Sequence, residues 1–215
     1  VPTSLLEPYT INSVAMNGTN IFAGSELQGI YVSTNKGISW RKDTLNYRTF
    51  LVLAVNQSKI FAGSAGHGIY TSTNNGLNWI QASFNSQYIS SFAFNGSIVY
   101  AGYFNNQSGI GGIVKSTDNG LTWTQLSSLN KLVKALAFDN SNLIAGTTMG
   151  IYLSTNGGQN WIQKNQGFTI SPSISSILIN NGIIIAGDNT YSLWKRTLSE
   201  FVGIQNISTE IPAKY

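Results

Sequence analysis

An eight-residue phrase that ends in tryptophan occurs four times in this sequence, and this repetition constrains the fold more than any other feature. The phrase reads STNKGISW at 33–40, STNNGLNW at 72–79, STDNGLTW at 116–123 and STNGGQNW at 154–161. The copies recur at a period of about 40 residues, which is typical of propellers and solenoids. The content of a single repeat distinguishes between these two architectures.

Each repeat contains four short segments that have the composition of β-strands. In the second repeat they are LVLAVNQ from residue 51, IFAGS from 60, GIYTSTN from 68 and WIQASF from 79. They are rich in β-branched and aromatic residues and are bounded by Gly, Asn or Ser, which indicates strands joined by tight turns. No stretch has a sustained helical period of apolar residues. Four antiparallel strands in about 40 residues make one propeller blade.

The repeated phrase lies between the third and fourth strands of a blade, where a polar turn leads into a strand. An Asn or Asp side chain accepts hydrogen bonds from the backbone of its own turn, and Gly adopts a positive φ without steric cost. The tryptophan begins the fourth strand, and we expect it to fold back over the hairpin and bury on the order of 200 Å². The phrase is therefore predicted to be a structural turn closed by an aromatic plug.

The four phrases resemble the Asp-box, or BNR, repeat, whose pattern is S-x-D/N-x-G-x-x-W. This repeat is found in sialidases, in sortilin-type receptors, in photosystem II assembly factors of the propeller type and in secreted bacterial repeat proteins. The resemblance extends over residues 11 to about 199, with Asn in place of Asp in three of the four copies. The matching positions, which we expect to be structural, are Ser33, Asn35, Gly37, Trp40, Ser72, Asn74, Gly76, Trp79, Ser116, Asp118, Gly120, Trp123, Ser154, Asn156, Gly158 and Trp161.

Each repeat has an Ala-Gly pair in its second strand, and the sequence contains five such pairs. There are therefore five repeats, and the fifth lacks the tryptophan phrase. We therefore predict an all-β, five-bladed β-propeller with four-stranded antiparallel blades, forming a single domain over residues 1–199. The blades are expected at about 11–49, 50–89, 90–131, 132–171 and 172–199. Residues 1–8 align with the outer strand that begins at Trp79, so we expect this N-terminal strand to complete the last blade and close the ring, which removes exposed strand edges. An open fragment of a larger ring or solenoid is the alternative.

Residues 200–215 break the repeat and are expected to form a C-terminal linker or tail. This segment resembles the junction that precedes a type IX secretion sorting domain in secreted BNR-repeat proteins. The chain begins with Val1 rather than Met, which suggests a processed or trimmed N-terminus. Together these features imply a bacterial protein that is secreted or held at the cell surface.

The charge pattern argues against several classes of partner. Only 9% of the residues are charged, the formal net charge is +4, and the basic residues form no cluster, so we expect no nucleic-acid partner. No apolar run approaches the ~18 residues of a membrane helix, so any association with a cell surface or membrane complex is expected to be peripheral. The chain has no cysteine and a single histidine, so we expect neither a metal site nor a cofactor.

Enzymatic chemistry has little support in the sequence. The resemblance to sialidases implies an arginine triad, a Tyr/Glu nucleophile pair and an acidic acid/base, but the three arginines, Arg41, Arg48 and Arg196, do not fall at equivalent inner-strand positions. A glycosidase needs two facing carboxylates, and only Glu26 and Asp188 lie in equivalent loops between second and third strands. Solvated loop acids are the simpler interpretation of this pair, so we expect no catalytic residue.

Binding is the better supported function. In a propeller the loops between second and third strands, and those between consecutive blades, emerge on one face opposite the repeated phrases. Loops on a rigid scaffold commonly carry function, and the third repeat has an insertion there, YFNNQSGIG at 103–111. The candidate ligand-binding residues are Tyr103, Phe104, Tyr47, Arg48, Tyr88, His67 and Phe168. Packing between blades is the alternative for each aromatic residue.

Three hypotheses follow from the sequence. The first is a secreted, non-catalytic binding or scaffold module that recognises a glycan or a protein through this loop face. The second, from the resemblance to photosystem assembly propellers, is an accessory or assembly subunit of a membrane-associated complex. The third is a glycosidase-like carbohydrate-active enzyme that uses Glu26 and Asp188.

Overall fold

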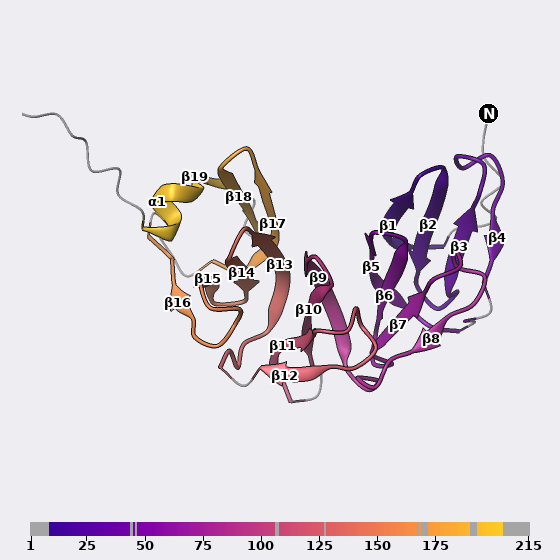
Figure 1. Cartoon of the computed structure of the whole chain (residues 1–215), viewed down its shortest axis with the longest axis horizontal. Coiled ribbons are helices and arrows are strands. Elements are labelled where there is room, and N and C mark those ends of the chain that lie inside the picture. The colour runs from indigo at the N-terminus through magenta and orange to yellow at the C-terminus, as the bar shows by residue number, and fades with distance from the viewer. Residues whose placement is uncertain are drawn as a thin grey trace, which may run out of the picture.

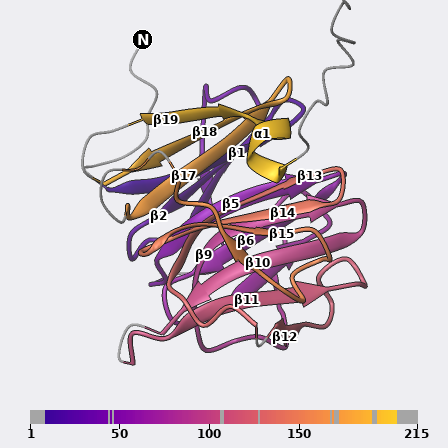
Figure 2. The ribbon, with the colours of Figure 1, turned by 90° about the vertical axis from the view of Figure 1, so that its left-hand side faces the viewer.

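The protein is an all-β propeller with five blades. The computed structural model describes residues 9–43, 45, 47–105, 108–126, 128–166, 168, 172–189 and 193–203. Over these residues the strands form four four-stranded sheets and one three-stranded sheet, each built from consecutive antiparallel strands. Figure 1 shows the sheets arranged side by side around a common centre, with the first strand of each sheet innermost, and Figure 2 shows the strands of successive blades running alongside one another. The predicted five-bladed β-propeller is confirmed.

The strands follow the four segments of each repeat. The first blade contains β1 (Ile11–Asn17), β2 (Asn20–Ser25), β3 (Ile30–Ser33) and β4 (Arg41–Lys42). The second contains β5 (Phe50–Asn56), β6 (Lys59–Ser64), β7 (Ile69–Ser72) and β8 (Ile80–Gln81). The third contains β9 (Tyr88–Asn95), β10 (Ile98–Phe104), β11 (Gly111–Ser116) and β12 (Thr124–Leu126). The fourth contains β13 (Val133–Asp139), β14 (Asn142–Thr147), β15 (Gly150–Ser154) and β16 (Ile162–Gln163), and the fifth contains β17 (Ile174–Asn180), β18 (Ile183–Asp188) and β19 (Leu193–Thr197).

The four tryptophan phrases form turns with one shared hydrogen-bond pattern, and we call them the box turns (residues 33–40, 72–79, 116–123 and 154–161). In the second box turn the buried hydroxyl of Ser72 accepts a hydrogen bond from the Gly76 amide at 2.9 Å and donates one to Asn74 Oδ1 at 3.0 Å. Asn74 Oδ1 also accepts from the amide of Asn78 at 2.9 Å. The same three bonds recur in the other box turns. Asn therefore keeps the three shared bonds, which use one acceptor oxygen, whereas Asp118 also accepts from Thr122 Oγ1 through its second oxygen.

The box turns of the second and third blades also bond to the blade before them. Arg41 Nη2 in the first blade donates to the carbonyl of Gly76 at 3.0 Å, and Lys59 Nζ in the second donates to the carbonyl of Asn119 at 2.8 Å. Trp79 packs partly buried against the core between the first and second blades. The tryptophan thus packs across a blade interface as well as beside its own turn.

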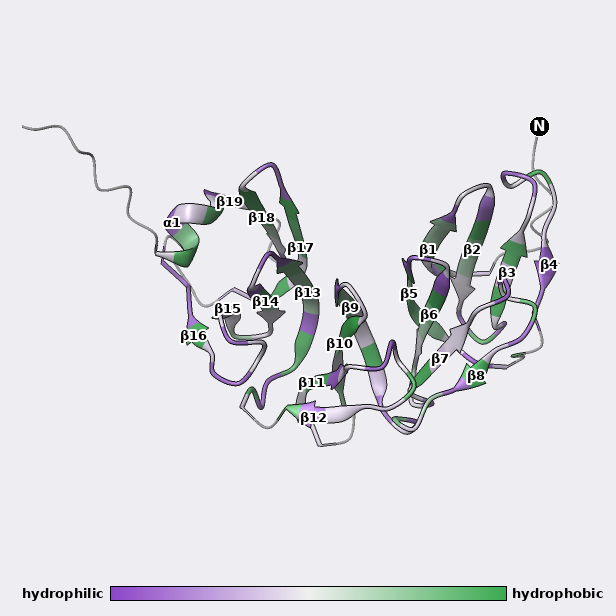
Figure 3. Cartoon of the chain, viewed as in Figure 1, coloured by the Kyte–Doolittle hydropathy of each residue, from purple (hydrophilic) through white to green (hydrophobic). Residues whose placement is uncertain are grey.

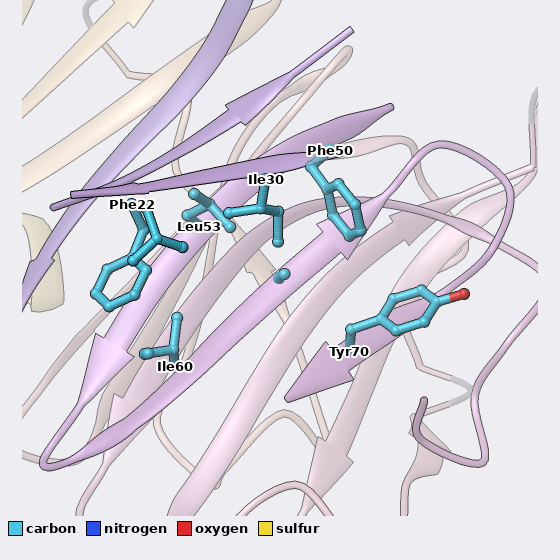
Figure 4. Close-up of a cluster of buried hydrophobic side chains, with 8 residues drawn as sticks. Phe22, Ile30, Phe50, Leu53, Ile60 and Tyr70 are labelled. Atoms are coloured by element: carbon cyan, nitrogen blue, oxygen red, sulfur yellow. The ribbon is translucent and has the colours of Figure 1, made fainter. Parts of the chain in front are cut away.

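Apolar side chains are concentrated between neighbouring blades. Figure 3 shows the hydrophobic residues gathered on the inner strands of the sheets, whereas β4 at the outer edge is hydrophilic. The cluster in Figure 4 combines Phe22 and Ile30 of the first blade with Leu53, Ile60 and Tyr70 of the second, all of them buried. The core of this protein is therefore a series of interfaces between sheets, so the stability of each blade depends on its neighbours.

In the first four blades the glycine of the Ala-Gly pair allows the next blade to approach. A Cβ added at Gly63 would lie 2.6 Å from Ile89 Cγ2 of the third blade, and one added at Gly146 would lie 2.6 Å from Ile174 Cγ2 of the fifth. Neither glycine has a positive φ, so backbone conformation does not require it. The residue is needed because the innermost strand of the following blade packs directly on this position.

The five blades form an arc. The innermost strands pack in succession, β1 on β5, β5 on β9, β9 on β13 and β13 on β17. Within the described part of the chain, β17 and β1 do not pack on one another in this way, and Figure 1 shows the separation between them. The strand that we expected to close the ring, residues 1–8, lies outside the described residues, as do residues 204–215 of the expected tail. The described blades therefore do not show the closed ring expected from the sequence.

A short helix, α1 (Leu198–Val202), follows the fifth blade, where the sequence analysis predicts a strand end and a tail. The Thr197 side chain caps its N-terminus by accepting from the amide of Glu200, and Gly203 ends it in the left-handed conformation with φ 88°. Phe201 is buried in the core between the fourth and fifth blades. The signal for this helix is present in the sequence, because Thr followed three residues later by Glu is a capping box and Gly is the preferred residue after a helix.

Candidate binding surface

Loops from neighbouring blades meet at the end of the molecule opposite the box turns, and we call this end the loop face. It contains the connections between second and third strands and those between consecutive blades. The amide of Gly29 donates to the carbonyl of Arg48 at 3.0 Å, and the amide of Gly68 donates to the carbonyl of Gln87 at 3.0 Å. These bonds join the two kinds of loop at equivalent places in successive blades. Side chains on the loop face therefore project from a backbone that is held by hydrogen bonds.

Three of the predicted ligand-binding residues lie together where the second and third blades meet, and we call them the aromatic patch: His67, Tyr88 and Phe104. Tyr88 and Phe104 are paired across β9 and β10, and their rings stack with centroids 5.1 Å apart and an interplanar angle of 30°. The Tyr88 ring leans over Gly66, where an added Cβ would lie 3.5 Å from Tyr88 Cε2. His67, the next residue, is exposed. The patch therefore offers two half-buried rings beside an imidazole.

The loop that carries His67 is held by its own hydrogen bonds. Ser64 Oγ accepts from the His67 amide at 3.1 Å, and Gln81 Nε2 donates to the His67 carbonyl at 2.8 Å. His67 Nδ1 lies 3.2 Å from the carbonyl oxygen of Ala65. The backbone that carries the imidazole is thus held by hydrogen bonds. The Nε2 atom of the ring can donate to a ligand or accept from it, depending on the tautomer.

Tyr103, which the sequence analysis places on the binding surface, is instead buried in the core between the second and third blades. Its ring meets Phe84 edge-on at 5.1 Å, and Gln125 donates a hydrogen bond to its hydroxyl. Burial raises the pKa of Tyr103. Adjacent residues of a strand point to opposite faces of the sheet, so Tyr103 and Phe104 cannot both face the loop surface. The interpretation of Tyr103 as a ligand-binding residue is therefore replaced by a packing role.

Tyr47 and Arg48 lie where the first and second blades meet, and they differ in role. Tyr47 is 84% exposed and adopts a positive φ of 59°, which displays its ring to solvent. Arg48 is half-buried, with its Cζ 5.6 Å above the ring of Tyr70. Its Nε is buried and has no hydrogen-bond partner among the described residues. Tyr47 is therefore free to contact a ligand, whereas Arg48 mainly packs on the core.

Phe168 lies apart from the aromatic patch, in the connection between the fourth and fifth blades. Its ring stacks on Trp194 with centroids 5.3 Å apart and an interplanar angle of 20°. Both rings pack against the cluster that contains Phe201. Phe168 is thus a packing residue of the last interface, and the seven predicted residues do not form one site.

Several exposed apolar residues of the loop face were missed because each is isolated in the sequence. Leu27 is 59% exposed, Ile110 is 57% exposed and Met149 is 47% exposed, and each belongs to the loop between the second and third strands of a different blade. The signal in each case is a single apolar residue one or two positions before a glycine in the turn. Together with the aromatic patch, these side chains place exposed apolar groups on the loop face of the first four blades.

The acidic residues of the described part of the protein are spread over several blades. Glu26 and Asp188 lie in the first and fifth blades, at the two ends of the arc. Asp43 is buried, and its Oδ1 accepts from the amides of Ile30 and Leu45 at 3.2 and 3.0 Å, while desolvation raises its pKa. No group of three or more His, Cys, Asp and Glu able to hold a metal ion occurs within the described ranges.

A groove of about 290 Å³ lies on the opposite side of the molecule, between the outer strand of the second blade and the third box turn. Its lining combines polar and apolar residues, among them Thr71 and Gln81 from the second blade and Leu121 from the third. Lys59 lines it too, but its Nζ is already bonded to a box-turn carbonyl, and burial lowers its pKa. The groove carries no titratable side chain that is free to act on a ligand among these lining residues.

Comparisons with known proteins place the fold among β-propellers. No protein-family model matches the chain, and no curated protein matches it either. A GH74 xyloglucanase from Xanthomonas campestris is similar in structure, with a TM-score of 0.68 and 16% identity over 85% of this chain and 35% of that one. The extracellular domain of BT4673 from B. thetaiotaomicron has a TM-score of 0.70 and 18% identity over 91% of this chain and 28% of that one. YCF48 bound to D1 peptide has a TM-score of 0.64 and 16% identity over 91% of this chain and 67% of that one.

These likenesses show the fold alone, because the identities are low. The chain spans about a third of the GH74 enzyme and of the BT4673 domain and two thirds of YCF48. The set includes an enzyme, an extracellular domain and a peptide complex, so one scaffold carries different functions. In the described part of this protein, no helix is both long and apolar enough to span a membrane.

Proposed function

We propose that this protein is a non-catalytic recognition module of the Asp-box propeller type, which binds its partner through the aromatic patch of the loop face. The observation that carries the proposal is the stacked Tyr88–Phe104 pair beside exposed His67, on loops fixed by backbone hydrogen bonds. Aromatic rings with polar neighbours provide apolar contact area at a small entropy cost, as in many binding surfaces. The box-turn hydrogen bonds support the assignment to the Asp-box type.

The ligand that fits this surface is an uncharged or weakly charged chain, either a glycan or an extended polypeptide. The patch contains no carboxylate, lysine or arginine, so shape and stacking dominate over ion pairing. The peptide seen in the YCF48 complex supports a polypeptide ligand, and the GH74 likeness supports a saccharide. We place the protein outside the cytoplasm, at the cell surface or secreted by the type IX route, with support from the extracellular BT4673 domain.

The assembly-subunit hypothesis is a second candidate, and the YCF48 complex is the observation that favours it. A scaffold that holds a peptide segment of another protein needs no catalytic group, and the loop face offers such a surface. Copurification with integral membrane proteins from the native envelope supports this role, whereas recovery only as a free protein in the medium contradicts it.

The test is a parallel screen of a glycan array and a peptide array with the full chain and two variants. Tyr88→Ala combined with Phe104→Ala removes both rings of the patch, and we expect it to abolish any selective signal. The matched control is Leu77→Ala, which removes an exposed apolar side chain from a box turn on the opposite face. Thermal unfolding of each variant checks that the fold is intact.

The outcomes separate the ligand classes and the role of the patch. Selective glycan signals lost in the double variant identify a lectin-like module, and peptide signals lost in it identify a protein-binding module. Signals that survive in the double variant, while the fold is intact, contradict the placement of the site. Turnover of a glycoside, lost on replacement of Glu26 or Asp188, contradicts the non-catalytic role.

A further inference from the structure

The third strands of the blades reveal which blade faces are covered. The residue of this strand that pairs with the glycine of the Ala-Gly segment is fully buried in the first four blades, with 0% exposure for Ile30, Ile69, Ile113 and Ile151. Leu193 has the same place in the fifth blade, because it pairs with Gly187 as Ile69 pairs with Gly63. Leu193 is 81% exposed. The difference arises because each of the first four blades is covered by the blade that follows it.

The first blade shows the corresponding difference on its other face. Val14 pairs with the alanine of its Ala-Gly segment, as Leu53 does in the second blade. Leu53 is 6% exposed because it packs against the first blade, whereas Val14 is 58% exposed. Met16, two residues further along the same face of β1, is 60% exposed. The arc therefore ends in two apolar surfaces, which we call the end faces.

Gly187 is an independent sign of a missing neighbour. The equivalent Gly63 is required by close approach of the following blade, as Ile89 shows. Among the described residues, an added Cβ at Gly187 would meet only Ser176 and Leu193, both in its own blade, and Gly187 has no positive φ. The fifth blade thus keeps the residue that interior blades need for contact with a following sheet.

We propose that the two end faces are blade interfaces, and that further four-stranded blades of the same repeat type occupy them and complete a larger ring. The end faces continue an interface that is already formed four times within the chain, and they expose the residue classes that this interface buries. The length of the YCF48 propeller agrees with this arrangement. Its match to 91% of this chain uses 67% of its own length, which leaves room for about two blades of 40 residues.

A second copy of this chain is the competing occupant, because it presents the same two faces. A second copy adds five blades, which is more than the remainder of one ring. The contacts between copies are then head-to-tail, and they continue into larger oligomers unless the copies close into a ring. The state of association of the chain in solution therefore distinguishes the two occupants.

The decisive experiment extends the full chain at its C-terminus with a second copy of residues 50–131, which contain the second and third blades. We expect the extended chain to remain monomeric and its thermal midpoint to rise by at least about 5 °C, because buried contacts form at both end faces. Leu193→Lys in the extended chain is expected to cancel this rise. Leu77→Lys is the matched control, since Leu77 is 60% exposed on a box turn away from the end faces, and it should leave the rise unchanged.

The unextended chain supplies a measurement that does not depend on folding of the added blades. We expect it to bind an apolar fluorescent dye, and Leu193→Lys combined with Met16→Lys should reduce that signal by more than half while leaving the thermal midpoint within about 2 °C. An extended chain with an unchanged midpoint, or dye binding that the double variant does not reduce, overturns the proposal. Concentration-dependent oligomers of the unextended chain that Leu193→Lys dissolves also overturn it, in favour of a second copy as the occupant.

Discussion

Two equivalent apolar residues provide a sharp test of how the blades hold together. Ile69 opens the third strand of the second blade with 0% exposure, in a cluster with Ile89 and Val114 of the third blade. Leu193 has the equivalent position in the fifth blade and is 81% exposed. Replacement of each by Ala removes three carbon atoms. At ~0.8 kcal/mol per buried carbon, Ile69→Ala loses about 2.4 kcal/mol of transfer free energy, and the cavity raises the total to about 3 to 4 kcal/mol.

Leu193→Ala should change the free energy of unfolding by about 0.5 kcal/mol or less, because its side chain is already in water. Urea unfolding monitored by circular dichroism measures both variants, with the slope m checked against the parent chain. In a domain of this size the Ile69→Ala loss corresponds to a fall of the thermal midpoint by roughly 6 to 16 °C. Equal losses for the two variants, or a larger loss for Leu193→Ala, would refute the reasoning that blade contacts bury one residue and not the other.

Three further substitutions test separate parts of the account. Gly63→Ala places a Cβ 2.6 Å from Ile89, so thermal unfolding should show a loss of about 1 to 3 kcal/mol, and an unchanged midpoint contradicts the close approach of the blades. Ser72→Ala leaves the buried Gly76 amide without its acceptor and should cost about 1 to 3 kcal/mol, measured by urea unfolding against Ser72→Thr, which keeps the hydroxyl. Burial raises the pKa of Asp43 above its unfolded value, so its charge lowers stability increasingly as pH rises from the unfolded pKa through the folded one. Asp43→Asn should therefore raise the thermal midpoint at pH 7, and below the unfolded pKa the variant should match the parent chain. A gain in midpoint that persists at the lowest pH would contradict an effect of the buried carboxylate charge.

Local sequence patterns were sufficient to predict the blades. The tryptophan phrases mark the boundary between third and fourth strands, and the Ala-Gly pairs mark the second strands. Repetition of these two markers predicts how the nineteen strands of the described residues divide into five sheets. The turn chemistry was equally predictable, because Ser72, Asn74 and Gly76 act within a single turn. The helix after Thr197 carried a capping signal of the same local kind, and it was missed because the strand repeat continues up to that residue.

The binding surface was less predictable because its composition depends on contacts between blades. Tyr103 and Phe104 are adjacent in sequence, and only the phase of β10 decides that one is buried against Phe84 while the other stacks on Tyr88. The exposure of Leu193 is likewise a property of the neighbouring blade and not of its own strand. Single-strand patterns do not encode which face of a strand has a partner, and this is where expectation and structure differ.

Isothermal titration of the ligand selected by the arrays tests the central claim most directly, with Phe104→Leu as the decisive variant. Leucine keeps an apolar side chain opposite Tyr88 but removes the stacking ring. We expect the affinity to weaken by about two- to tenfold, with a thermal midpoint close to that of the parent chain, because an aromatic contact contributes about 0.5 to 1.5 kcal/mol beyond its burial. Leu77→Ala, at an exposed apolar side chain on the opposite face, should bind as the parent does. Equal affinity of Phe104→Leu and the parent chain would contradict recognition through the aromatic patch.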